Sequence, residues 1–244
     1  PEGLSHIKVD EPTMSMLFTS NNSPFFGREG TLVTSRQLRE RLFRETEKNL
    51  ALKVEETGLS EAFMVLGRGI LHLSILIETM RREGFELQVG QPKVLLKEIN
   101  RMNHEPVEVL MVQLPERFAG KVIEQVAQRK GEIVNIEVKD DRAYLDFRIP
   151  SRGIIGLKNL LLTATEGEAV MAHRFDSYEP WKGEMLQKRN GSLVAMETGI
   201  ATSYAIDKLQ DRGRFFIFPG EEVYMGQVIG ESRRQDDITV NVTK

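Results

Sequence analysis

Cysteine is absent from the 244-residue sequence. The chain therefore forms no disulfide, carries no thiolate nucleophile and offers no cysteine ligand to a metal, which is consistent with a reducing compartment. The sequence also lacks an apolar run of the length that spans a membrane, and residues 1–5 lack the features of a secretory signal. We expect a cytoplasmic protein without a membrane-spanning segment.

A strong charge of one sign is also lacking. The formal net charge is −3, 40% of the residues are hydrophobic and 28% are charged. This composition is typical of a globular protein, and the length allows two or three domains. Because no long segment is basic overall, binding to nucleic acid would depend on local basic patches.

Catalytic motifs are missing as well. There is no Gly-x4-Gly-Lys-Ser/Thr phosphate loop and no Gly-x-Ser-x-Gly elbow, and Gly67-Arg68-Gly69 has Leu73 in place of the third glycine of a dinucleotide-binding loop. The adjacent carboxylates at 140–141 and 236–237 lie in predicted turns, so they do not face each other across a substrate. We predict that the chain has no catalytic site.

The histidines give no metal motif. They occur at neither an i, i+4 nor a His-x-His spacing, and they are His6, His72, His104 and His173. His72 lies beside the apolar face of a predicted helix, so we expect it to be half-buried with one hydrogen bond. We expect no metal and no cofactor in this chain.

The most informative stretch is residues 67–87. A glycine pair ends a predicted strand, and a helix follows that Gly84 is placed to end. The apolar face of this helix is formed by Ile70, Leu73, Ile77 and Met80. Residues 151–163 repeat the pattern, with Arg152 matching Arg68. The repeat indicates that one small unit was used twice.

The elements around this stretch follow the ferredoxin-like order βαββαβ. The first copy spans residues 12–90, after a tail of a preceding domain at 1–11. Its other elements are strands at 11–18, 51–55, 62–66 and 85–89, a turn at 57–60, and a helix at 34–49 that begins with a capping box of Thr34 and Gln37.

The second copy spans residues 91–180 and includes a connector with a strand at 93–99. Its predicted elements are a strand at 107–114, a helix opened by Pro115, a hairpin of 132–138 and 142–149, a helix at 153–166 and a strand at 168–178. The predicted fold class is α+β, with two ferredoxin-like domains followed by a small β-rich domain.

The third domain spans residues 181–244 and is punctuated by glycines. Its predicted elements are strands at 192–197, 214–218 and 222–229 and a helix at 204–210. A strand at 238–243 ends the chain with no visible partner, from which we expect truncation there. The lack of an initiator methionine likewise indicates an excised or processed chain.

Local basic residues form the candidate site. Arg152 and Lys158 lie in the first turns of the second copy's helix, where free backbone N–H groups favour anions. The other candidates are Lys208, Arg212 and Arg214 around a helix end, Arg233 and Arg234 in a polar loop, and Lys244. Interleaved acidic residues leave open the alternative that each is an ordinary surface charge.

Several motifs resemble elongation-factor-G-like translational GTPases. Residues 67–73 resemble the Gly-x-Gly-Glu-Leu-His-Leu segment of their third domain, with Ile70 in place of the glutamate. Residues 115–123 and 129–133 resemble the opening of their fifth domain. Residues 151–157 and 209–213 are similar to one ribosome-binding member of that family.

The resemblance implies a non-catalytic C-terminal half of a translational GTPase. The two copies would correspond to domains III and V, with domain IV missing between residues 90 and 105, and the third domain would be specific to that member. GTP and magnesium would bind in a GTPase domain upstream of Pro1, which a β-barrel domain accompanies.

The resemblance also implies partners. The protein would be a monomer that binds the ribosome at the A-site region, through rRNA and the acceptor end of the tRNA, with roles in growth under stress and large-subunit assembly. The eight candidate basic residues would contact phosphates, and residues 233–244 would lie nearest the tRNA.

Two other hypotheses stay open. One is an enzyme with a small-molecule site between the two copies, because ferredoxin-like folds host many reactions. The other is a regulatory module that binds small ligands at equivalent sites formed by residues 67–69 and 152–153.

Overall fold

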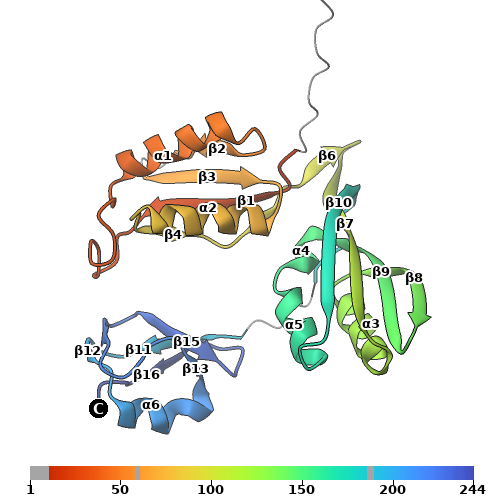
Figure 1. The fold of residues 1–244 in the computed structure, drawn as a ribbon. Helices are drawn as coiled ribbons and strands as arrows, with labels where there is room; N and C mark the ends of the chain where they lie inside the picture. Colours follow the sequence, from red (N-terminus) through yellow and green to blue (C-terminus); the bar gives the residue numbers. More distant parts are fainter. Residues whose placement is uncertain (1–10, 59–60, 186–189) are drawn as a thin grey trace, which may run out of the picture. The chain divides into compact units, whose positions relative to one another are not determined.

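The computed structural model describes residues 11–58, 61–185 and 190–244. The chain divides into two compact units, Pro1–Met185 and Leu186–Lys244 (Figure 1). The division follows Met185 rather than residue 180 because residues 181–183 contact the second copy. Residues 1–10 of the predicted tail at 1–11 and residues 59–60 of the predicted turn at 57–60 lie outside the described residues.

The first copy forms a sheet of strand order β2-β3-β1-β4. Its elements are β1 (Met14–Ser20), α1 (Ser35–Lys48), β2 (Lys53–Glu56), β3 (Ala62–Gly67), α2 (Ile70–Arg82) and β4 (Leu87–Val89). The capping box at α1 is present, since Thr34 and Gln37 each accept a hydrogen bond from the other's backbone N–H. The predicted βαββαβ order is confirmed for this copy.

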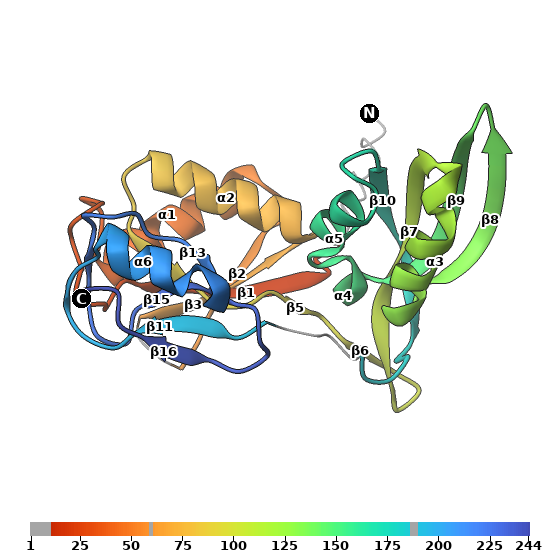
Figure 2. The same cartoon turned by 90° about the horizontal axis from the view of Figure 1, so that it is seen from below.

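Both helices of the first copy cover one face of its sheet (Figure 2). Phe18 of β1 and Phe63 of β3 are register partners and therefore point to the same face. They share one buried core with Leu42 of α1 and with Leu73 and Met80 of α2. The inward-facing side chains of the strands and the apolar faces of the two helices thus pack in a single core layer.

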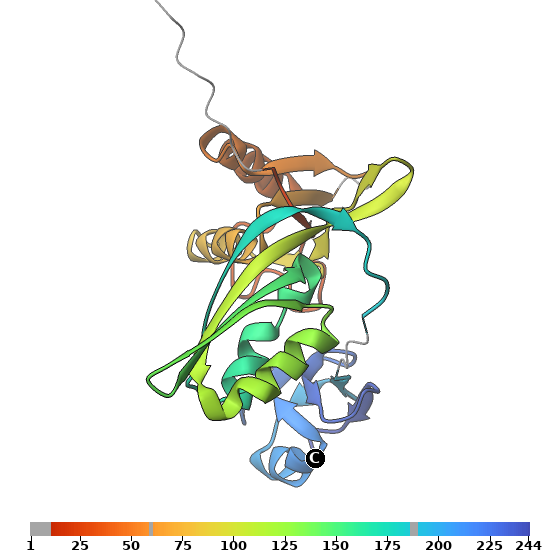
Figure 3. The ribbon, with the colours of Figure 1, turned by 90° about the vertical axis from the view of Figure 1, so that its right-hand side faces the viewer.

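The second copy forms a separate sheet of order β10-β7-β9-β8. Its elements are β7 (Met102–Pro115), a 3-10 turn η1 (Glu116–Phe118), α3 (Ala119–Gln128), β8 (Glu132–Lys139), β9 (Arg142–Pro150), α4 (Ser151–Ile154), α5 (Leu157–Ala164) and β10 (Val170–Pro180). The helices lie on one face of the sheet (Figure 3). The described strands therefore form two ferredoxin-like sheets rather than one continuous sheet.

The predicted helix at 153–166 is wrong, because the structure has two helices there. Gly156 adopts φ 74°, a left-handed conformation that ends the first turn before α5 begins. The Arg129 guanidinium donates to the carbonyl oxygens of Gly153 and Ile155 at 2.9 and 2.8 Å. This side chain thereby satisfies backbone groups that a continuous helix would pair internally.

The predicted connector strand is also divided in two. β5 (Lys93–Val94) pairs with β1 of the first sheet, whereas β6 (Lys97–Ile99) pairs with β7 of the second. The connector therefore links the two sheets by backbone hydrogen bonds and explains why both copies fall in one compact unit.

The second compact unit is a small β-rich domain. Its elements are β11 (Ser192–Ala195), β12 (Gly199–Ile200), α6 (Ser203–Leu209), a 3-10 turn η2 (Gln210–Arg212), β13 (Gly213–Phe215), β14 (Glu222–Val223), β15 (Val228–Ser232) and β16 (Ile238–Val240). The main sheet has the order β13-β15-β11-β16. Leu193, Ile229 and Val240 are buried at its centre.

The C-terminal strand has a partner. β16 pairs in parallel with β11, with Val194 opposite Thr239. The expectation that the C-terminal strand has no partner, from which truncation was inferred, is therefore wrong. Across the described residues, no helix is both long and apolar enough to cross a bilayer.

Candidate nucleic-acid interface

Four candidate arginines meet at one corner of the second unit, which we call the basic corner (Arg212, Arg214, Arg233 and Arg234). Arg214 lies opposite Glu231 in the β13–β15 pairing. Beyond the end of β15, the backbone N–H of Arg233 donates to the carbonyl oxygen of Arg212 at 2.9 Å. The pairing therefore joins two basic segments that are separate in the sequence.

A glycine makes this approach possible. A Cβ atom on Gly213 would lie 2.0 Å from the carbonyl oxygen of Glu231, well inside contact distance. Gly213 has φ 170°, which any residue adopts, so the requirement comes from space and not from backbone strain. β13 can lie against β15 here only because residue 213 has no side chain.

The carboxylates around the basic corner are partly engaged elsewhere. Glu231 accepts a hydrogen bond from the Asn190 amide at 2.9 Å, and Asp237 accepts one from the backbone N–H of Ser192 at 2.6 Å. Within the described ranges, none of the four arginines forms an ion pair with a carboxylate, and all four are exposed. Their guanidinium groups are therefore available to a polyanion.

The candidate lysines lie outside the basic corner. Lys208 is exposed on α6 and stacks over the Tyr204 ring at 4.3 Å. Lys244 pairs with Glu197 at 3.1 Å. The Thr243 hydroxyl and the Lys244 ammonium lower the pKa of Glu197 to about 2, so this carboxylate stays charged beside the lysine. Lys158 is exposed at the start of α5, in the other compact unit.

Arg152 does not lie at an accessible surface, so its assignment as a phosphate contact is corrected. Its side chain is buried, pairs with the fully buried Glu105 and stacks over the Trp181 ring at 3.7 Å. Besides its two hydrogen bonds to Glu105, Arg152 donates one to the carbonyl oxygen of Gly183 at 2.6 Å. Arg152 is a structural residue that holds the segment after β10.

Two exposed aromatic residues beside the basic corner were missed from the sequence. Phe216 and Phe218 are 58% and 70% exposed, whereas Phe215 and Ile217 pack against the core of the unit. β13 ends at Phe215, but exposed and half-buried residues continue to alternate from Arg214 to Phe218, so both rings are exposed in the segment that begins with Arg214. The signal was present as an arginine and two phenylalanines at every second position of residues 214–218.

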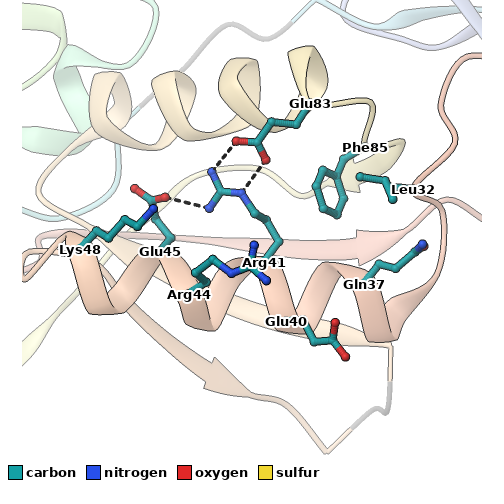
Figure 4. A pocket seen from close by; sticks show the side chains of 9 residues that line it. All are labelled: Leu32, Gln37, Glu40, Arg41, Arg44, Glu45, Lys48, Glu83 and Phe85. Atoms are coloured by element: carbon teal, nitrogen blue, oxygen red, sulfur yellow. Dashed lines mark hydrogen bonds and ion pairs between the residues drawn. The ribbon is translucent and has the colours of Figure 1, made fainter.

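Outside the second unit, a hollow of about 360 Å³ lies between α1 and the segment that follows α2 (Figure 4). At its centre Arg41 contacts Glu83 and Glu45 at 2.6 and 2.8 Å. The hydrogen bonds that Arg41 donates to Glu83 raise the pKa of Arg41 further. The three cations of the lining, Arg41, Arg44 and Lys48, are balanced by three carboxylates, Glu40, Glu45 and Glu83. The hollow therefore carries no excess charge, and its ion pairs connect α1 to the end of α2.

A second hollow of about 430 Å³ is lined by residues of both copies, including Gly69, His72 and His173. The His72 ring is half-buried and both of its nitrogens have partners, the Asn49 amide and the Arg68 backbone N–H. Burial lowers the pKa of His72, which favours the neutral ring. The prediction of a half-buried histidine is therefore confirmed, with two hydrogen bonds rather than one.

The two glycine–arginine segments do not form equivalent sites. Gly69 lines the second hollow with open space around its Cα, whereas a Cβ on Gly153 would lie 2.9 Å from the Arg129 carbonyl oxygen. Within the residues that the structure describes, no three potential metal ligands come together. These observations speak against the hypothesis of paired small-ligand sites.

Comparison with known proteins places the chain. The profile "Elongation factor G C-terminus" matches residues 102–189, and "TypA/BipA C-terminal domain" matches residues 190–244. The "Large ribosomal subunit assembly factor BipA" of Synechocystis is 50% identical over 100% of this chain and 41% of its own length. The chain belongs to the TypA/BipA family.

Other TypA/BipA relatives agree. The "Large ribosomal subunit assembly factor BipA" of Bacillus subtilis is 48% identical over 98% of this chain and 39% of its own length. A "Putative elongation factor TypA-like SVR3, chloroplastic" of Arabidopsis thaliana is 47% identical over 99% of this chain and 36% of its own length. The chain thus spans about two fifths of the length of these TypA/BipA proteins. The TypA/BipA C-terminal domain coincides with the second compact unit.

Proposed function

We propose that this chain is the non-catalytic, ribosome-binding part of a TypA/BipA translational GTPase and that its basic corner contacts RNA phosphates. Exposed arginines from two segments, without an ion pair to any carboxylate among the described residues, are the observation that carries this proposal. Arginine contacts to phosphate hold a protein in position on RNA without reading its sequence. We infer the ribosome as the partner because the relatives are named as large ribosomal subunit assembly factors.

The exposed rings of Phe216 and Phe218 extend this proposal. Aromatic side chains beside phosphate contacts stack on unpaired bases in single-stranded or splayed RNA. We place this surface in the A-site region of the ribosome, beside the acceptor end of the tRNA, and include Lys208 and Lys244 as weaker contacts. Lys158 would contact rRNA from the other unit.

In this proposal GTP and magnesium bind to a GTPase domain that is not part of this chain. The chain has no phosphate loop, so we assign it no role in hydrolysis. We propose that the protein acts as a monomer in the cytoplasm, in large-subunit assembly and in growth under stress.

Pelleting of the chain with ribosomes over a series of salt concentrations tests the proposal. The logarithm of the affinity should fall linearly with the logarithm of the salt concentration, with a slope of about −0.7 for each phosphate of a single strand that is neutralised. Arg233→Glu should weaken binding at every salt concentration and reduce the slope by about 1.

Lys244→Glu is the matched control, because it changes the charge of the same unit by the same amount but removes the ion pair with Glu197 instead. It should weaken binding less than Arg233→Glu. Binding that does not depend on salt would refute the proposal. Equal losses in both variants would show that overall charge, not the basic corner, is responsible.

A further inference from the structure

The two copies of the ferredoxin-like fold differ in the length and composition of one edge strand of their sheets. β2 and β8 occupy the same place in the βαββαβ order, next to β3 and β9 and with no strand beyond them in the described residues. β2 has only four residues, three of them charged. Short length and charge are common ways of protecting a sheet edge from further pairing.

β8 has neither protection. It is eight residues long, all of them exposed, and it forms the outer edge of its sheet (Figure 2). Four apolar β-branched side chains are 41–63% exposed, namely Ile133, Val134, Ile136 and Val138. A bulge at Val134 interrupts only the start of the strand, so residues 135–139 present a regular ladder of unpaired backbone groups.

Apolar and charged side chains of β8 lie on opposite faces of the sheet. Ile136 lies opposite Leu145 and Val138 opposite Ala143, and both partners are buried under the helices. Glu137 lies opposite Tyr144 on the open face. An added strand would therefore bring alternate residues against an apolar surface and against a carboxylate.

The charge around β8 is negative. Along the regular part of the edge, exposed or half-exposed carboxylates at Glu137, Asp140, Asp141 and Asp146 outnumber the cations Lys139 and Arg142. At the start of β8, Glu132 is already paired with Lys182 at 2.9 Å. This excess disfavours RNA. It also disfavours a second copy of the chain, because β8 paired with itself would place the same carboxylates on both sides of the seam.

The other edge of this sheet is not equivalent. His173, Arg174 and Phe175 of β10 line the second hollow together with residues of α2. Lys182 reaches only Glu132 at the start of β8, so residues 135–139 form a stretch of edge on which no further strand lies in the described structure.

We propose that the free edge of β8 accepts an extended, basic segment of a partner protein as an additional strand. The segment alternates lysine or arginine with β-branched apolar residues, so that its apolar side chains cover Ile136 and Val138 and its cations meet Glu137. Main-chain hydrogen bonds supply affinity in this mode of recognition, and the alternating side chains supply specificity. This surface is separate from the basic corner, so it does not depend on RNA binding.

Two matched peptides test the proposal on the chain as it exists. One is the acetylated and amidated sequence Lys-Val-Lys-Ile-Lys-Val-Lys, and the other replaces every lysine with glutamate. Fluorescence anisotropy of the labelled peptides measures affinity, and amide hydrogen exchange locates the site. The basic peptide should bind at least tenfold more tightly than the acidic one and should slow exchange within β8.

Three variants of the chain complete the experiment. Ile136→Lys should weaken binding of the basic peptide at least tenfold, and Glu137→Lys should remove the preference for it. Val170→Lys is the matched control, because Val170 is 61% exposed on the opposite edge strand of the same sheet, and binding should be unchanged.

Several outcomes would overturn the proposal. One is a dissociation constant above about 1 mM for the basic peptide, and another is slower exchange at β10 instead of β8. Protection of β8 that grows with the concentration of the chain alone would identify a second copy as the occupant. Protection of β8 by a single-stranded oligouridylate would identify RNA.

Discussion

The buried contact between Arg152 and Glu105 allows a sharp prediction. Arg152 Nη2 lies 3.0 Å from Glu105 Oε1, and Glu105 Oε1 also accepts the backbone N–H of Lys182 at 2.8 Å. Glu105 is 0% exposed and Arg152 is 9% exposed, so water cannot replace either partner. Trp181 covers the guanidinium at 3.7 Å.

Arg152→Ala should reduce the free energy of unfolding of this unit by about 3–5 kcal/mol, because it leaves a buried carboxylate with one remaining backbone donor. Arg152→Lys keeps the charge but loses the two-point contact, and we expect a cost of about 1–3 kcal/mol. The pair Arg152→Met with Glu105→Gln removes both charges. It should destabilise less than Arg152→Ala, since no buried charge is left unpaired.

Urea unfolding followed by Trp181 fluorescence measures these effects. Trp181 is the single tryptophan of the chain, so the transition reports the unit that contains this contact. The matched control is Arg68→Ala, because Arg68 is the residue of the first copy that aligns with Arg152 and it is exposed. Its effect should stay within about 0.5 kcal/mol. Equal shifts for Arg152→Ala and Arg68→Ala would refute the reasoning.

Three further predictions concern other contacts. The hydrogen bond that the His173 ring donates to Glu108 raises the pKa of His173, so this contact adds stability below pH about 6.5, the unfolded value, and loses it as pH rises through the folded pKa. Glu108→Gln should remove that dependence in urea titrations between pH 5 and 9, and parallel curves for the two proteins would contradict this. Gly213→Ala should destabilise the second unit by about 1–3 kcal/mol and speed amide exchange in β13 and β15. Gly69→Ala is the control, because a Cβ at Gly69 would meet no atom, and it should change neither stability nor exchange. Thr34→Ala removes the cap of α1 and should cost about 1 kcal/mol in thermal unfolding, and no shift would mean that the cap is dispensable.

The order of elements in both copies could be predicted because its signals are local. The capping box at Thr34, the apolar spacing of the helix after Gly69 and the alternation in the strands each depend on residues within a few positions. The division of the helix after Pro150 could not be predicted. It depends on Arg129, whose guanidinium reaches across more than twenty positions to the carbonyl oxygens.

The candidate site was predicted residue by residue but not as an arrangement. Arginines at 212–214 and at 233–234 were separate in the sequence, and only the β13–β15 pairing brings them together. Burial of Arg152 could not be read from its position at a helix start, because Glu105 and Gly183 lie far away in the chain. Both the clustering of the arginines and the burial of Arg152 depend on contacts between residues that are far apart in the sequence.

Aligned positions in the two copies differ where each copy meets something outside its own core. Arg68 is exposed, whereas Arg152 holds the segment that leaves β10. The short, charged β2 and the long, apolar β8 differ in the same way. Since the cores of the two copies are built alike, shared topology does not account for these differences. They mark the second copy as the one that carries attachments, through Arg152 to the following segment and, as we propose, along residues 135–139 of β8.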